Sequence, residues 1–123
     1  MKLEINRDNK NGIYKCRLRQ KSLSWFSEST FRAIINGIVA HIEKDPNNIL
    51  LEFQHIGSLP TIALNYISKL INITKNANRI IAFVNPPENI RNTLLAIEKK
   101  YTTPPFFIAS SNKDALLKFS EMN

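Results

Sequence analysis

Residues 49–85, ILLEFQHIGSLPTIALNYISKLINITKNANRIIAFVN, contain the pattern that decides the fold. A short apolar run at 49–53 is followed by apolar residues at helical spacing and then by a second apolar run at 79–85. Apolar runs without polar alternation are typical of parallel strands covered on both faces. This stretch therefore predicts a β-α-β unit. Its helix starts near residues 58–61, ends at 76–78 and buries Ile62, Tyr66, Ile67, Leu70 and Ile71.

The flanking sequence continues the alternation of strands and helices. A first helix follows an N-cap at Ser27 or Ser29 and ends at residues 45–48, a third helix opens at 86–88, and a final helix starts at 111–114 after a strand at 106–109. The first of these helices is expected to bury Phe31, Ile34, Ile35, Ile38 and Ile42. The third is expected to bury Ile90, Leu94, Ile97 and Tyr101, and the final one Ala115, Leu116 and Phe119.

The first twenty residues predict a β-hairpin with strands at 2–8 and 13–20, because the Asn11-Gly12 step allows the positive φ of a tight turn. In the second strand, apolar and cationic residues alternate strictly, which indicates one buried face and one basic face. The apolar positions are Tyr14, Cys16 and Leu18, and the basic surface is Lys15, Arg17, Arg19 and Lys21.

These elements predict an α/β fold in a single domain over residues 1–123. The order is β-β-α-β-α-β-α-β-α, with a mixed, mostly parallel sheet of about five strands and about four helices. Strands that alternate with helices after an initial hairpin give a sheet of this kind.

Composition narrows the class of protein. The chain has 123 residues, 43% of them hydrophobic, and a formal net charge of +7, and its single cysteine excludes an internal disulfide framework. No apolar run reaches the roughly 20 residues that span a bilayer. We therefore expect a cytoplasmic protein, whose basic excess suits either an acidic partner or nucleic acid.

The sequence is poor in groups that carry chemistry. Three glycines are too few for a phosphate-binding glycine loop, and the two histidines fit no zinc pattern. We expect His41 to be solvated, His55 to lie in a loop after a strand and Cys16 to be buried. Glu52 is either edge-facing or a buried, partnered carboxylate. These residues predict a non-enzymatic protein with no cofactor and no metal site.

In order and spacing, the predicted elements resemble the STAS domain of bacterial anti-sigma factor antagonists. The similarity covers nearly the whole chain: the hairpin, the first long helix, the spacing of the strands at 49–53 and 80–84, and the ending FIASSNKDAL at 107–116. That ending is similar to the family's last strand, its serine and its acidic-Ala-Leu helix start. The resemblance implies a STAS-like (anti-sigma factor antagonist) fold and a regulatory protein that binds a protein partner.

In this family, a serine or threonine at the start of the second helix is phosphorylated by an anti-sigma factor that is also a serine kinase. Alignment of the flanking strands places the family's Asp-Ser-Ser-Gly-Leu signature on residues 60–64, PTIAL. Thr61 then occupies the phosphoacceptor position, Pro60 replaces the Asp, and Ser58 is a second candidate acceptor. The residues alone leave open that Thr61 and Ser58 are helix caps.

By the same resemblance, the partner-binding surface is the helix start and the loop before it. It comprises Gln54, His55, Gly57, Ser58, Pro60 and Thr61, with Trp25 and Phe26 as a further contact. Trp25-Phe26 is also consistent with a hydrophobic staple before the first helix.

Three functions follow from these observations. The first is an anti-sigma factor antagonist-like regulator, whose partner is an anti-sigma factor serine kinase and whose switch is phosphorylation. The alternative is a STAS-type accessory subunit that binds the ATPase of a cytoplasmic ABC transporter complex. The third, nucleic-acid binding through the basic strand at 15–21, lacks the interleaved aromatics of a single-strand platform.

Overall fold

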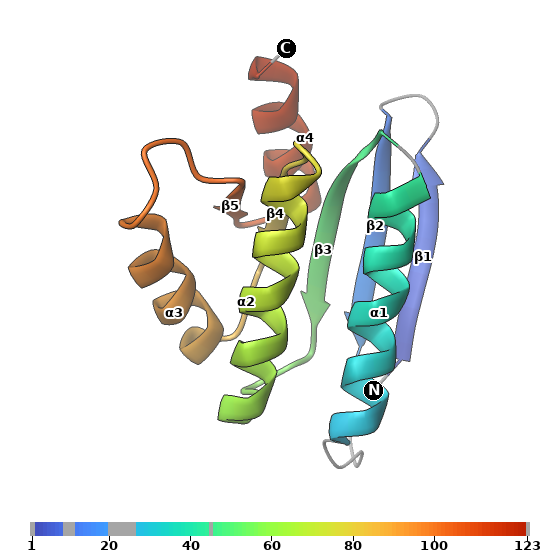
Figure 1. The fold of residues 1–123 in the computed structure, drawn as a ribbon, viewed down its shortest axis with the longest axis vertical. Coiled ribbons are helices and arrows are strands. Elements are labelled where there is room, and N and C mark those ends of the chain that lie inside the picture. Colours follow the sequence, from blue (N-terminus) through green and yellow to red (C-terminus); the bar gives the residue numbers. More distant parts are fainter. Residues whose placement is uncertain (1, 9–11, 20–26, 45, 123) are drawn as a thin grey trace.

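The computed structural model describes residues 2–8, 12–19, 27–44 and 46–122, and within them the elements follow in the predicted order (Figure 1). The strands are β1 (Lys2–Asp8), β2 (Ile13–Arg19), β3 (Asn48–Gln54), β4 (Ile81–Val84) and β5 (Phe106–Ala109). The helices are α1 (Glu28–Lys44), α2 (Thr61–Asn76), α3 (Glu88–Glu98) and α4 (Asn112–Glu121).

The strands form one sheet in the order β1-β2-β3-β4-β5. β1 runs antiparallel to β2, and every other neighbouring pair is parallel. The predicted mixed, mostly parallel α/β sheet is therefore confirmed.

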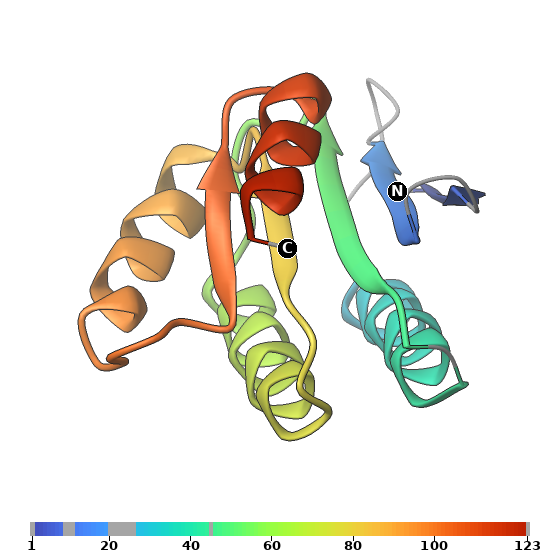
Figure 2. The same ribbon diagram turned by 90° about the horizontal axis from the view of Figure 1, so that it is seen from above.

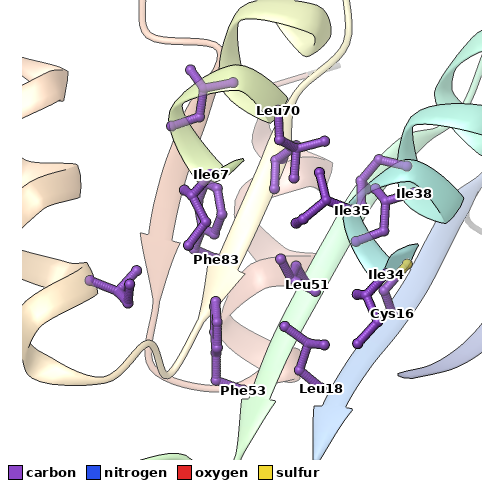
Figure 3. Close-up of a cluster of buried hydrophobic side chains, with 14 of the residues drawn as sticks. Cys16, Leu18, Ile34, Ile35, Ile38, Leu51, Phe53, Ile67, Leu70 and Phe83 are labelled. Atoms are coloured by element: carbon purple, nitrogen blue, oxygen red, sulfur yellow. The ribbon is translucent and has the colours of Figure 1, made fainter. Parts of the chain in front are cut away.

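The sheet is covered unequally on its two faces (Figure 2). The larger core packs α1, α2 and α3 against side chains such as Cys16, Leu51 and Phe83, and Figure 3 shows part of it. On the opposite face, α4 packs a smaller core that includes Leu50 and Val84. β3 and β4 are thus buried on both faces, as their apolar runs predict.

Local signals in the sequence explain where two helices begin. The backbone N–H of Thr30 donates to Ser27 Oγ at 3.3 Å, so Ser27 caps α1. Ser111 Oγ accepts from the N–H of Asp114 at 3.1 Å, and the Asp114 carboxylate accepts from the N–H of Ser110 at 3.2 Å. The predicted stripe of α1 is buried as expected, from Phe31 to Ile42.

Two predicted boundaries are wrong. β4 is shorter than residues 79–85, because Asn85 has a φ of 52° and the N–H of Ile80 donates to the Asn48 side chain at 3.0 Å. α3 ends at Glu98, so Tyr101 lies beyond the helix. Tyr101 is nevertheless partly buried against the larger core, as predicted for its side chain.

Loss of packing between α2 and the sheet should destabilise the whole chain. Leu70 is fully buried, so Leu70→Ala removes apolar contacts and leaves a cavity. We expect urea denaturation to show a loss of about 2–5 kcal/mol in the free energy of unfolding. Leu117→Ala is the matched control, because the Leu117 side chain is 58% exposed and the change should stay within about 0.5 kcal/mol. Equal losses in the two variants would contradict this assignment of the core.

Candidate functional site

The candidate site lies at the edge of the sheet where the parallel strands end. Carboxyl ends of parallel strands meet at one edge, and ligands of α/β proteins often bind there. The starts of α1, α2 and α3 lie together at this end of the molecule (Figure 1). The loop between β3 and α2, residues 55–60, is part of this edge.

Two apolar residues and one hydrogen bond anchor the loop at 55–60. Leu59 is only 4% exposed, and Ile56 packs against the larger core. The Asn89 side-chain amide, from the first turn of α3, donates to the carbonyl of Leu59. His55, with a φ of 57°, and Gly57 face solvent, so the structure presents an anchored loop with a polar outer surface.

Thr61 is the first residue of α2, and its side chain is exposed. The N-cap is Pro60, with a φ of −63°, and no side-chain hydrogen bond caps the helix. The interpretation of Thr61 and Ser58 as side-chain caps is therefore wrong, because proline takes the cap position and offers no side-chain acceptor. The hydroxyl at the start of α2 is left facing outward.

The buried face predicted for α2 is wrong at Ile62. The helix buries Ala63, Ile67, Leu70, Ile71 and Thr74, which turns the Ile62 side chain outward beside Thr61 at 37% exposure. Residues three or four apart share a helical face, and the buried stripe from Ala63 to Thr74 follows this spacing, whereas Ile62 lies outside it. An exposed isoleucine therefore lies next to the candidate phosphoacceptor.

The segment that carries Thr61 has no formal charge of its own. Residues 53–68 include no Lys, Arg, Asp or Glu, and the first turn of α2 has no acidic residue. In the part of the chain that the structure describes, no three His, Cys, Asp or Glu residues gather in a way that could hold a metal ion.

Tyr66, predicted to be buried, is half-buried and joins α2 to the start of α1. Its hydroxyl donates to the Glu28 carboxylate at 2.9 Å, and its ring meets the Phe31 ring edge-on at 6.1 Å between centroids. The hydrogen bond to Glu28 raises the pKa of Tyr66. The two helices are thus held side by side one turn beyond Thr61.

Cross-strand pairs restrain the predicted basic surface. Arg17 Nε donates to Glu52 Oε1 at 2.8 Å, and Arg19 Nε donates to Gln54 Oε1 at 2.9 Å. Glu52 is therefore half-buried and partnered, which answers the question that the sequence left open. Lys15 also lies on this strand and is half-buried. The Glu52 carboxylate offsets the charge of Arg17, whereas the neutral Gln54 orients Arg19 and leaves its charge in place.

The remaining predicted site residues do not all lie near Thr61. Gln54 is on the strand face that carries Glu52 and Leu50, so its side chain belongs with Arg19 rather than with Thr61. Lys21, Trp25 and Phe26 lie outside the described residues. Asn89 was missed, because a single asparagine carries no signal for a partner 30 residues away in sequence.

The histidines show no catalytic arrangement. His41 is half-buried, and its ring centroid lies 4.8 Å from that of Tyr14. The prediction that this side chain is solvated is therefore wrong where the ring packs against Tyr14. His55 is exposed in its loop, as predicted. Within the described ranges, no helix is long and apolar enough to cross a bilayer.

Comparison with known proteins supports the fold. Neither the protein-family models nor the curated protein sequences yield a match to this sequence. Among solved structures, a serine-to-glutamate variant of RsbS from Moorella thermoacetica is similar, with a TM-score of 0.74 at 6% sequence identity. The similarity covers 99% of this chain and 97% of that one. The chain has a STAS-like fold.

The thiol of Cys16 should be unreactive in the folded chain. Cys16 is buried between the sheet and α1, and burial raises its pKa to about 12. We expect a thiol-disulfide exchange reagent at about pH 8 to label the folded chain slowly and the urea-unfolded chain at one thiol per molecule. Because the pKa of the folded thiol lies above the ordinary thiol value of 9.0, this group's contribution to stability is complete below about pH 9 and declines as the pH rises above it. Rapid labelling of the folded chain would contradict the buried position.

Proposed function

We propose that this chain is a non-enzymatic regulator that binds a protein partner through the start of α2, in the manner of an anti-sigma factor antagonist, and that phosphorylation of Thr61 releases the partner. The observation that carries the proposal is the exposed hydroxyl of Thr61 at a helix start without a side-chain cap, in a segment, residues 53–68, that contains no charged residue. The STAS-like fold supports it, because it brings the hydroxyl to the edge where the family resemblance locates the switch.

A phosphate at Thr61 would be accommodated by the chain itself. It adds close to two negative charges, and the N-terminus of a helix favours an anion through its free N–H groups and its dipole. α2 has 16 residues, and its cap brings no competing side-chain acceptor. Phosphorylation therefore needs no rearrangement of the fold.

The same phosphate would act strongly on a docked partner. The exposed residues of this segment include Ile62 as an apolar contact and the small residues Ser58 and Gly57, and residues 53–68 contain no charged side chain. A partner that fits this surface excludes water from it. A new charge buried there without a counter-ion costs about 3–5 kcal/mol, which is enough to release the partner.

Phosphorylation is tested with the candidate serine/threonine kinases encoded in the same genome. We expect incubation with the correct kinase and Mg-ATP to place one phosphate on the proteolytic fragment that contains Thr61, as located by mass spectrometry. Thr61→Val should abolish this product and Ser58→Ala should leave it. A phosphate that persists in Thr61→Val, or none with any of these kinases, would remove the switch from the proposal.

Partner release is tested with matched substitutions at Thr61. Thr61→Glu places a charge at the helix start and Thr61→Val keeps the shape without one. Calorimetry with the purified neighbouring-gene partners should show binding weakened on the order of a hundredfold by Thr61→Glu and nearly unchanged by Thr61→Val. Equal affinities would contradict the proposed surface. Binding to a transporter ATPase rather than to a kinase would favour the accessory-subunit alternative.

A further inference from the structure

A second surface feature lies at the same edge of the sheet, where β4 and β5 end. A cleft of about 300 Å³ opens there between the first turns of α3 and α4. Its volume is at the small end of the range for ligand sites. The polar groups of its lining come from three segments: Asn85 after β4, Arg91 of α3, and Ser110, Asp114 and Lys118 around the start of α4.

The topology of the sheet explains why the cleft forms at this place. β4 and β5 are adjacent and parallel, but the chain leaves them toward opposite faces (Figure 2). After β4 it enters α3, on the face of α1 and α2, and after β5 it enters α4, on the other face. The two connections diverge and leave a crevice. In open α/β sheets, ligands bind at such a switch point.

The charged side chains that line the cleft differ in how many hydrogen-bond or ion-pair partners they already have. The Asp114 carboxylate accepts from the N–H of Ser110 and lies 3.7 Å from Lys118 Nζ, so it is engaged in the start of α4. Lys118 Nζ also donates to the carbonyl of Ile108 at 3.0 Å. Arg91 is exposed, and its guanidinium makes no hydrogen bond or ion pair with any residue that the structure describes. The cleft lining thus carries two cations, Arg91 and Lys118, and one carboxylate, Asp114, which already has partners within the start of α4.

We propose that this cleft binds a small phosphate-bearing molecule. Arg91 of α3 supplies a fork of N–H donors, and the segment at the start of α4 supplies Lys118 as a second positive charge and the Ser110 hydroxyl, which lies 3.5 Å from the Asp114 carboxylate. A tetrahedral phosphate has oxygens for donors from both segments, and its negative charge is attracted to the net charge of +1 that Arg91, Lys118 and Asp114 carry together. The proposal does not depend on partner binding at Thr61, because no residue of α2 lines the cleft.

The proposal is tested by NMR titration of the full chain with inorganic phosphate and, separately, with glycerol phosphate, at constant ionic strength. We expect saturable shifts in the backbone amides of Asn85, Ser110 and Arg91. Arg91→Gln should weaken binding about tenfold or more, because a hydrogen bond to a charged group is worth about 1.5–3 kcal/mol. Lys69→Gln, an exposed site on α2, removes the same charge and should leave the affinity within twofold.

Three results would overturn the proposal. Shifts that spread over the basic residues of the chain without saturating would indicate attraction to its net charge of +7 rather than a site. Equal weakening by Arg91→Gln and Lys69→Gln would indicate the same. Acetate that binds as tightly as phosphate in the cleft would exclude selectivity for phosphate. Arg91 is exposed, so the glutamine variant should fold, and its amide spectrum shows directly whether it does.

Discussion

Every crossover between neighbouring parallel strands in this sheet passes over the same face. The strands follow in sequence order from β2 to β5, and each crossover helix packs into the larger core. Crossovers of one hand along a sheet that grows in one direction must all lie on one side. Of the helices that the structure describes, only α4, after the last strand, packs on the other face. The two faces of the sheet therefore differ, and the surfaces described above follow from that difference.

One consequence is that the sheet face covered by α4 is polar at β2. α4 covers β3, β4 and β5 but does not reach the outer part of β2, so β2 cannot be apolar on both sides. Arg17 and Arg19 occupy the positions that no helix covers, and they pair with Glu52 and Gln54 on β3. Pairs exposed to this degree stabilise a protein by less than about 1 kcal/mol. They serve chiefly to satisfy charge beside a core, so the basic strand needs no nucleic acid to explain it.

Sequence predicts the features that repeat along the chain and misses those that depend on a single contact. The stripe of α1 and the two-sided burial of β3 and β4 follow from periodicity, and the structure confirms them. Ile62 was misplaced because a large apolar side chain outweighs Ala63 in a pattern, whereas close packing on the sheet selects the small residue. The cleft at Arg91 was not predictable, since it depends on three segments that meet only in the folded chain.

Pro60 gives the start of α2 its distinct electrostatics. In the family signature an aspartate stands at this position, and an aspartate brings an acceptor and a negative charge to a helix start. Proline brings neither, and it leaves the cap without a side-chain hydrogen bond. The start of α2 therefore keeps more of its attraction for an anion. At the same time, the surface lacks an acidic side chain that a kinase could recognise. Under the proposed phosphorylation of Thr61, this one residue would change recognition by the kinase and stabilisation of the product in opposite directions. The helix start would then stabilise the phosphate well, and recognition would depend on the anchored loop at 55–60.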